Sequence, residues 1–108
     1  MSRITATEYQ TAACGTAIFP KETALAYLTL GLAGEAGEIA NKAKKLIRDG
    51  DNPTKREEIG KELGDVCWYL AVLSDELGLN LGQIMEQNID KLASRKKRGT
   101  LGGNGDNR

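Results

Sequence analysis

The chain alternates long stretches of helix-like apolar spacing with short polar or glycine-containing breaks. From about Lys21 to Arg48, and again after the break at 49–53, apolar residues recur every three or four positions. This spacing places them on one face of an α-helix. The apolar positions are Leu25, Leu28, Leu32, Ile39, Ala43 and Leu46 in the first stretch, and Ile59, Leu63, Val66, Leu70, Leu73 and Leu77 in the second. The pattern predicts two long helices in succession.

The breaks indicate where these helices begin and end. Gly50 fits the position just after the C-terminus of the first long helix. The next helix has two candidate starts, because Thr54 and Glu57 fit a capping box, whereas Asn52-Pro53 fits a cap followed by a proline at the first helical position. Gly78 marks the expected end of that second helix.

Two further segments complete the expected set of helices. Asn80 and Gln83 fit the cap of a helix from about Leu81 to Lys97, and residues 5–14 carry a weak pattern for a short first helix. No segment has the pattern of a strand. We therefore expect an all-α fold, a helical bundle of about four helices per chain with one long central helix pair. A chain of this size buries only about 60–70% of its unfolded surface, so homo-oligomerisation is expected to complete the bundle.

Charge and composition narrow the possible functions. Fifteen Lys and Arg residues balance fifteen Asp and Glu residues, and there is no histidine. The zero formal charge gives no general attraction to nucleic acid or to an anionic membrane, and neither partner is expected. Acid–base and metal chemistry must come chiefly from carboxylates. The charges are also grouped, because residues 57–90 hold eight acids and one base, whereas residues 91–98 hold five bases and no acid.

The two cysteines, Cys14 and Cys67, are far apart and form neither a metal-ligand cluster nor a disulfide framework. Cys67 lies in an apolar run from Val66 to Leu70 and is expected to be a small core residue. The sequence has no signal-peptide pattern and no run of about 20 apolar residues. We therefore expect a cytoplasmic protein.

Two pairs of acidic residues stand at the edges of the apolar stripes: Glu35 with Glu38, and Glu62 with Asp65. Partners three residues apart lie about 60° apart on one helix face. If the long helices pack antiparallel, the pairs can converge, and four carboxylates together require protonation or a cation. Oxygen ligands suit a hard ion, so Mg²⁺ or Mn²⁺ is expected. The alternative is that both pairs lie on ordinary solvated helix faces.

Three glycines, Gly31, Gly34 and Gly37, interrupt the first long helix around the acidic pair. Each costs up to about 1 kcal/mol relative to alanine in a helix interior. Either they allow close packing of helices, or they leave room for a bulky ligand beside Glu35 and Glu38.

A polar residue, Asn88, sits in the apolar face of the last helix, with Lys91 and Arg95 at its flanks. It is either a buried amide with hydrogen-bond partners or a residue at the end of the bundle. The alternative is that all three residues face the acidic cleft, where the cations would contact an anionic ligand such as a polyphosphate.

The stretch Gly31-Leu-Ala-Gly-Glu35-Ala-Gly-Glu38, followed by Glu62-Leu-Gly-Asp65-Val-Cys-Trp-Tyr69, resembles the MazG-like all-α nucleoside triphosphate pyrophosphohydrolases. The family pattern is an E-x-x-E pair, a spacer and an E-x-x-D pair, and here the spacer holds 23 residues. The resemblance covers about residues 22–97. It implies a Mg²⁺-dependent enzyme, with Mn²⁺ as a substitute, that converts a (deoxy)nucleoside triphosphate to the monophosphate and pyrophosphate.

The resemblance also implies roles for individual residues. The four acids, Glu35, Glu38, Glu62 and Asp65, would be metal ligands or would activate the attacking water, with Glu38 preferred as the general base. The substrate-binding positions implied by the family are Tyr69, the lysines Lys42 and Lys45, and the N-x-x-K-L-x-x-R residues Asn88, Lys91 and Arg95. The family forms homodimers or homotetramers, and a house-cleaning or pool-controlling role in the cytoplasm is expected.

Residues 1–98 form the expected enzyme domain, and residues 99–108 form a glycine-rich tail. Many relatives continue the last motif with Tyr-Pro and an aromatic residue, whereas this chain reads Arg95-Lys-Lys-Arg-Gly-Thr100. The tail composition predicts disorder. A second hypothesis is that the tail folds over the cleft and contacts phosphate through main-chain N–H groups and Arg108. The rival function is a non-catalytic helical module that binds nucleotide or another protein.

Overall fold

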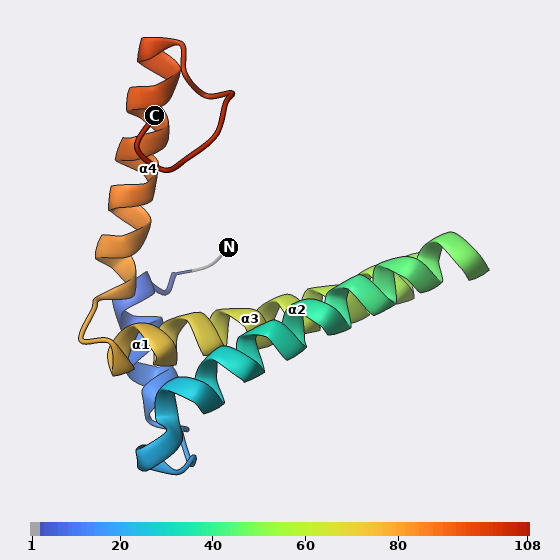
Figure 1. The fold of residues 1–108 in the computed structure, drawn as a ribbon. Helices are drawn as coiled ribbons and strands as arrows, with labels where there is room; N and C mark the ends of the chain where they lie inside the picture. The colour runs from blue at the N-terminus through green and yellow to red at the C-terminus, as the bar shows by residue number, and fades with distance from the viewer. Residues whose placement is uncertain (1–2) are drawn as a thin grey trace.

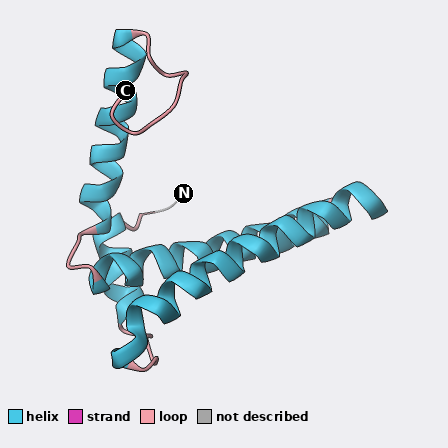
Figure 2. Ribbon diagram, viewed as in Figure 1, coloured by secondary structure: helices cyan, strands magenta, loops and turns pink. Residues whose placement is uncertain are grey.

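The computed structural model describes residues 3–108, which contain four α-helices, one short 3₁₀ turn and no strand (Figures 1 and 2). The all-α prediction is therefore confirmed. In chain order the elements are α1 (Ala6–Cys14), η1 (Lys21–Thr23), α2 (Ala24–Asp49), α3 (Pro53–Glu76) and α4 (Leu81–Arg98). Among these residues no helix is both long enough and apolar enough to cross a membrane.

Helices α2 and α3 run antiparallel along their length and form a long hairpin (Figure 1). The hairpin turn begins at Gly50, whose φ of 96° lies in a region that favours glycine. Asn52 caps α3, because its side chain accepts a hydrogen bond of 2.8 Å from the Lys55 main-chain N–H, and Pro53 is the first residue of the helix. Of the two predicted starts of α3, Asn52-Pro53 is confirmed and the capping box at Thr54 is wrong.

The core lies at one end of the molecule, where α1 packs against α3 and the first turns of α4. Its buried apolar residues are Ala13, Leu28, Ala71, Val72 and Leu81. The buried side chain of Gln10 joins three elements there: it donates to the carbonyl oxygens of Ala71 and Leu79 at 3.2 and 3.0 Å, and it accepts from the Leu81 N–H at 2.9 Å. This amide therefore fixes the direction in which α4 leaves the hairpin.

Helix α4 leaves the core at a steep angle to the hairpin and makes no packed contact with α2 in the described part of the chain (Figure 1). Its apolar side chains Met85 and Ile89 are 47% and 64% exposed, and Ile47 at the far end of α2 is 88% exposed. Residues 3–108 of one chain do not close a four-helix bundle, because the apolar faces of α4 and of the outer hairpin have no packing partner among them. Cys67 is also exposed, so its assignment as a core residue is wrong.

Residues 99–108 turn back along the outer half of α4 instead of extending away from it (Figure 1). The turn begins at Gly99, which caps the helix in the left-handed conformation, and the Thr100 N–H donates to the Arg95 carbonyl at 2.8 Å. The Arg108 side chain donates to carbonyl oxygens within the tail, including those of Thr100 and Leu101. The tail therefore lies on α4. This arrangement differs from the two expectations for the tail, which were disorder and closure over the acidic residues.

Candidate metal site

Three carboxylates meet near the middle of the hairpin: Glu35 from α2, and Glu62 and Asp65 from α3. One oxygen from each lies within 4.8 Å of the other two. Glu62 and Asp65 share a helix face because they are three residues apart, and the antiparallel pairing brings Glu35 opposite them. The structure thus brings together three of the four acids that the sequence singled out.

The fourth acid, Glu38, lies one helical turn beyond Glu35 and is exposed. Its carboxylate does not belong to the group of three. Its negative charge nevertheless contributes to the raised pKa of Glu35, which places it near the group. Glu38 therefore stands at the border of the site.

The pKa of Glu35 is raised, first by a hydrogen bond with Glu62, then by burial and by the negative charges of Asp65, Glu62 and Glu38. A raised carboxyl pKa at such a cluster indicates that negative charge is concentrated beyond what the nearby cations offset. The nearest cation is Lys42, whose Nζ lies 3.9 Å from Glu62 and 4.0 Å from Glu58. These are long ion-pair distances, so Lys42 offsets the charge only in part.

Tyr69 lies beside the acids, one turn after Asp65. Burial raises the pKa of its hydroxyl first, followed by the effects of Tyr27, Glu35 and Asp65. Its ring occupies the space that a side chain at Gly31 would need. Close packing therefore explains Gly31, whereas open space surrounds Gly34 and Gly37 within this chain.

Tyr9, on α1, is a neighbour of the site that sequence reasoning missed. Its hydroxyl donates to the Gly64 carbonyl at 3.5 Å, and its pKa is raised by burial, by Cys67 and by Asp65. The only sequence signal was the weak periodicity of the first segment, which gave no reason to place α1 against this part of α3. Trp68 donates from Nε1 to the Thr16 hydroxyl at 2.7 Å and so holds the loop after α1.

The two predicted lysines, Lys42 and Lys45, line a small hollow of about 110 Å³ between α2 and the start of α3. Glu58, one turn before Glu62, also lines it. Both lysines therefore lie on the hairpin next to the carboxylate group, at the end nearer the turn.

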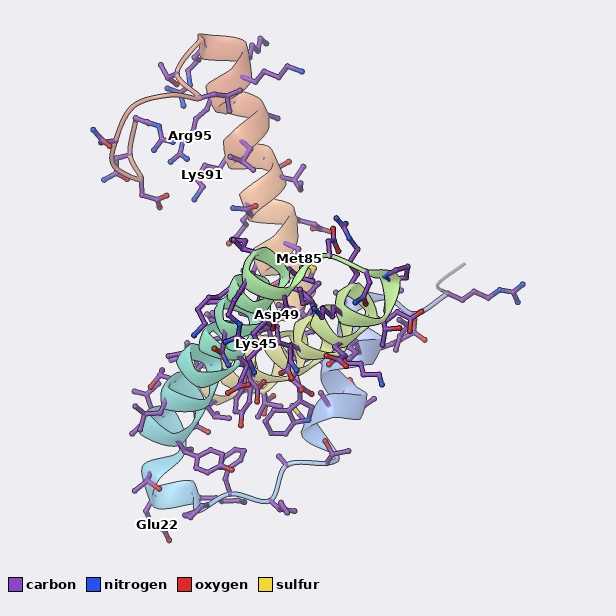
Figure 3. The ribbon with its side chains drawn as sticks, turned by 90° about the vertical axis from the view of Figure 1, so that its right-hand side faces the viewer. Glu22, Lys45, Asp49, Met85, Lys91 and Arg95 are labelled. Atoms are coloured by element: carbon purple, nitrogen blue, oxygen red, sulfur yellow. The ribbon has the colours of Figure 1, made fainter. Side chains whose placement is uncertain are left out.

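The three predicted residues of α4 lie elsewhere. Asn88 is exposed, and Lys91 and Arg95 contact Asp106 of the tail. Figure 3 shows Lys91 and Arg95 beside the tail and apart from Lys45 on the hairpin. Within one chain, then, the acids and Lys42 form one group and the α4 cations form another.

Comparison with known proteins adds an independent finding. The family model described as "MazG nucleotide pyrophosphohydrolase domain" matches residues 22–100, a span that includes α2, α3 and α4. The chain is 48% identical over 109 aligned positions to the Gene 37 protein of Mycobacterium phage L5, covering 93% of this chain and 96% of that one. It is 32% identical over 72 positions to the uncharacterized protein YvdC of Bacillus subtilis (strain 168), covering 59% of this chain and 68% of that one. No solved structure matches.

Proposed function

Because the chain belongs to the MazG nucleotide pyrophosphohydrolase family, we propose that it hydrolyses a (deoxy)nucleoside triphosphate to the monophosphate and pyrophosphate. The observation that carries this proposal is the group of Glu35, Glu62 and Asp65, whose oxygens lie within 4.8 Å of one another. Water would attack the α-phosphorus, and the bond to the bridging oxygen of the β-phosphate would break, releasing pyrophosphate.

We propose Mg²⁺ as the cofactor, with Mn²⁺ as a substitute, held by Glu35, Glu62 and Asp65. The donor set fits, because three carboxylates offer only the hard oxygen ligands that these ions prefer. The raised pKa of Glu35, caused first by its hydrogen bond with Glu62, then by burial and by the neighbouring negative charges, supports the same assignment, since a bound cation would stabilise the ionised carboxylates. When bound, the ion would neutralise phosphate oxygens and stabilise the charge that develops as the bond breaks.

Glu38 is the proposed general base. It is a carboxylate outside the group of three, exposed to solvent and one turn along α2 from Glu35. It would take a proton from the attacking water at one carboxylate oxygen. A chain without histidine has carboxylates as its main choice for this step near neutral pH.

Cations on the hairpin are proposed to bind the phosphates. Lys42 and Lys45 both face the hollow beside Glu58, and Lys42 lies within 4.0 Å of Glu62 and Glu58. A bound triphosphate carries more negative charge than the metal ion offsets, so these lysines would supply the remaining positive charge. Tyr69, held against Gly31, would contact the sugar or the phosphate nearest to it.

The residues of α4 require a second chain to reach this site. We propose a homodimer or homotetramer in which the exposed apolar faces of α4 and of the outer hairpin are covered, because they include Ile47 and Ile89, which are 88% and 64% exposed. Such an assembly would bring Asn88, Lys91 and Arg95 of one subunit toward the acids of another.

The proposal is tested by measuring pyrophosphate release from a panel of dNTPs with Mg²⁺ and with Mn²⁺. Glu62→Gln removes a proposed ligand, and Glu76→Gln removes an exposed acid at the end of the same helix as the control. Loss of residues that merely orient metal ligands lowers metal affinity or activity by 10- to 100-fold, so Glu62→Gln should lower turnover by at least about 100-fold. Glu76→Gln should retain it.

The rival functions make different predictions in the same experiment. Absence of divalent-dependent pyrophosphate release from every dNTP, together with thermal stabilisation by nucleotide, would indicate a nucleotide-binding module. Absence of both effects would indicate a protein-interaction module.

A further inference from the structure

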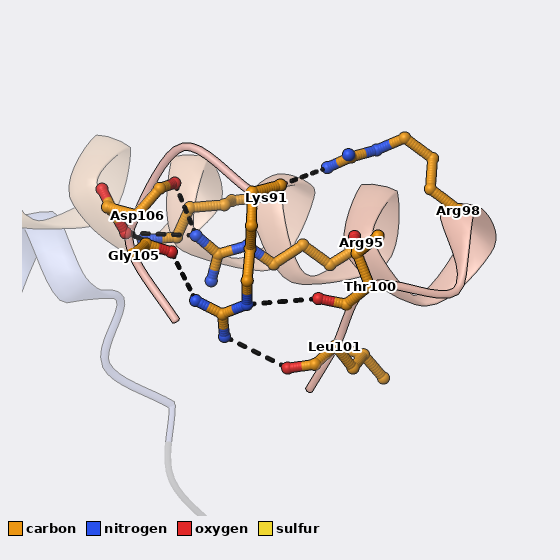
Figure 4. A network of polar contacts seen from close by, with 8 residues as sticks. Lys91, Arg95, Arg98, Thr100, Leu101, Gly105 and Asp106 are labelled. Atoms are coloured by element: carbon orange, nitrogen blue, oxygen red, sulfur yellow. Dashed lines mark hydrogen bonds and ion pairs between the residues drawn. The ribbon is translucent and has the colours of Figure 1, made fainter. Parts of the chain in front are cut away.

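The tail holds one carboxylate against the two cations of α4. The Asp106 Oδ1 lies 2.7 Å from the Lys91 Nζ and 3.2 Å from the Arg95 Nη2 (Figure 4). The same Nη2 donates to the Asp106 main-chain oxygen at 2.6 Å. Lys91 and Arg95 lie one turn apart on α4, so a single anionic group between them contacts both.

The contact with Arg95 leaves hydrogen-bonding capacity unused. Arg95 is 4% exposed and is the one charged side chain that is buried among residues 3–108. A guanidinium offers five N–H donors, yet the Nε of Arg95 is buried without a partner. With Asp106 in place one donor of the Arg95 guanidinium is therefore left unused, and a tetrahedral phosphate group has more acceptor oxygens to offer than a carboxylate.

The tail is held on α4 by contacts that are partly open to solvent. The Asp106 side chain is 79% exposed, and its ion pair with Lys91, whose side chain is 36% exposed, contributes little net stability. Gly99, Gly103 and Gly105 all have positive φ, and a glycine-rich segment loses much conformational freedom when it is ordered. The Arg108 side chain donates its three hydrogen bonds to carbonyl oxygens within the tail. The contact of the tail with both Lys91 and Arg95 is therefore made by the Asp106 side chain (Figure 4).

We propose that Asp106 is an internal substitute for a phosphate group, and that residues 99–108 cover Lys91 and Arg95 until a phosphate-bearing ligand displaces them. The ligand class is a pyrophosphate or the polyphosphate part of a nucleotide. This inference rests on the proposed function in one respect, namely that Lys91 and Arg95 of one subunit reach the triphosphate bound at the acids of another. It adds that the chain carries its own competitor for that site.

The experiment measures binding of inorganic pyrophosphate to the full chain by calorimetry, with chelator present and without divalent ions. Asp106→Asn removes the competing charge and keeps the tail length. Glu86→Gln, an exposed acid on the same helix without contact to Lys91 or Arg95, is the matched control. If the tail is closed in 70–90% of molecules, its release should tighten pyrophosphate binding by about 3- to 10-fold in Asp106→Asn. Glu86→Gln should bind as the wild-type chain does.

A second measurement follows the tail itself. In a chain labelled at glycine, pyrophosphate should move the amide signals of Gly103 and Gly105 toward their unfolded positions, and Asp106→Asn should show them there without ligand. Lys91→Met should weaken pyrophosphate binding both in the wild-type chain and in the Asp106→Asn chain. Equal affinities of wild type and Asp106→Asn, unchanged glycine signals, unaltered binding by Lys91→Met, or absence of pyrophosphate binding would each overturn the proposal.

The experiments distinguish a wrong proposal about Asp106 from a wrong proposal about the enzymatic function. The binding and tail measurements need neither a metal ion nor turnover, whereas the dNTP assay needs both. A chain that releases pyrophosphate from dNTPs but binds it equally with and without the Asp106 charge would keep its enzymatic function and lose the internal competitor.

Discussion

The ring of Tyr69 on α3 packs over Gly31 on α2, in the space that a side chain at residue 31 would fill. This contact lies one turn from Glu35 on one helix and one turn from Asp65 on the other. The packing of Tyr69 on Gly31 therefore lies directly beside the carboxylate group.

Gly31→Ala should therefore destabilise the chain. The added methyl group must push the Tyr69 ring aside, and overpacking of this kind costs about 1–3 kcal/mol, which outweighs the gain of up to about 1 kcal/mol in helix propensity. Gly34→Ala is the matched control, because an added Cβ there has no atom of another described segment within 4 Å and the propensity gain remains. Urea unfolding should show a lower free energy of unfolding for Gly31→Ala and a higher one for Gly34→Ala than for the wild-type chain. Equal changes in the two variants would mean that the Tyr69 contact does not contribute to stability.

Gln10→Ala should lower the stability of the domain. The substitution leaves the buried N–H of Leu81 and the carbonyls of Ala71 and Leu79 without their partner. A buried polar group without a hydrogen bond costs about 1–3 kcal/mol. Gln87→Ala, at an exposed position of α4, should change the free energy of unfolding by less than about 0.5 kcal/mol. Chemical denaturation followed by circular dichroism measures both, and a Gln10→Ala variant as stable as Gln87→Ala would contradict the role of the amide.

Mg²⁺ should raise the melting temperature of the wild-type chain through the carboxylate group. A ligand that binds only the folded state adds RT ln(1 + [L]/Kd), or about 2.7 kcal/mol at a hundredfold excess over Kd. The effect should vanish in Glu62→Gln and persist in Glu57→Gln, an exposed acid of α3 outside the group of three. Thermal unfolding of each variant with and without Mg²⁺, at about a hundredfold excess over Kd, gives the comparison. Equal stabilisation of both variants would place the ion elsewhere.

The thiol of Cys14 should react slowly at neutral pH. Burial raises its pKa first, and Asp75 raises it further through its charge and a hydrogen bond. Since only the thiolate reacts, the alkylation rate of a Cys67→Ser chain should rise with pH. The midpoint of this rise should lie above 9.0, the ordinary pKa of a cysteine thiol. The same chain in urea should show the ordinary midpoint.

The raised pKa of Cys14 also makes the stability of the chain depend on pH. Between the unfolded and folded pKa values of Cys14 the folded state binds more protons, so stability should fall as pH rises through and above 9.0. Cys14→Ser should remove that slope. A folded alkylation midpoint equal to the midpoint in urea would show that Asp75 and burial do not act on the thiol.

The sequence allowed the hairpin and most of its acidic group to be predicted, because both depend on local regularities. Helical spacing fixes which residues share a face, and a short turn forces the two long helices to run antiparallel. Gly50 and Asn52 are strong local signals for that turn. The three residues Glu35, Glu62 and Asp65 therefore came together as expected, once α2 and α3 were paired.

What could not be predicted depends on contacts between distant parts of the chain. Tyr9 approaches Asp65 because Gln10 ties α1 to the α3–α4 turn, and no periodicity in the first segment reports that tie. The direction of α4 follows from the same amide. Asp106 and Lys91, which are in contact, are 15 residues apart in the sequence. Their contact depends on the positive φ angles of tail glycines, whereas the glycine-rich composition by itself predicts disorder.

The direction in which α4 leaves the core has a consequence for its helix–coil balance. Among the described residues, its first turns are anchored by Leu81 and Gln10, while its outer half gains support from the tail alone. An isolated helical segment shorter than about 12–15 residues is marginal in water, and the outer half of this 18-residue helix is such a segment. Amide hydrogen exchange along α4 should therefore quicken from Leu81 toward Arg98. The outer half of α4 is covered by the tail or by a second subunit. This cover keeps the segment that carries Lys91 and Arg95 helical, and only a helical segment presents both cations on one side.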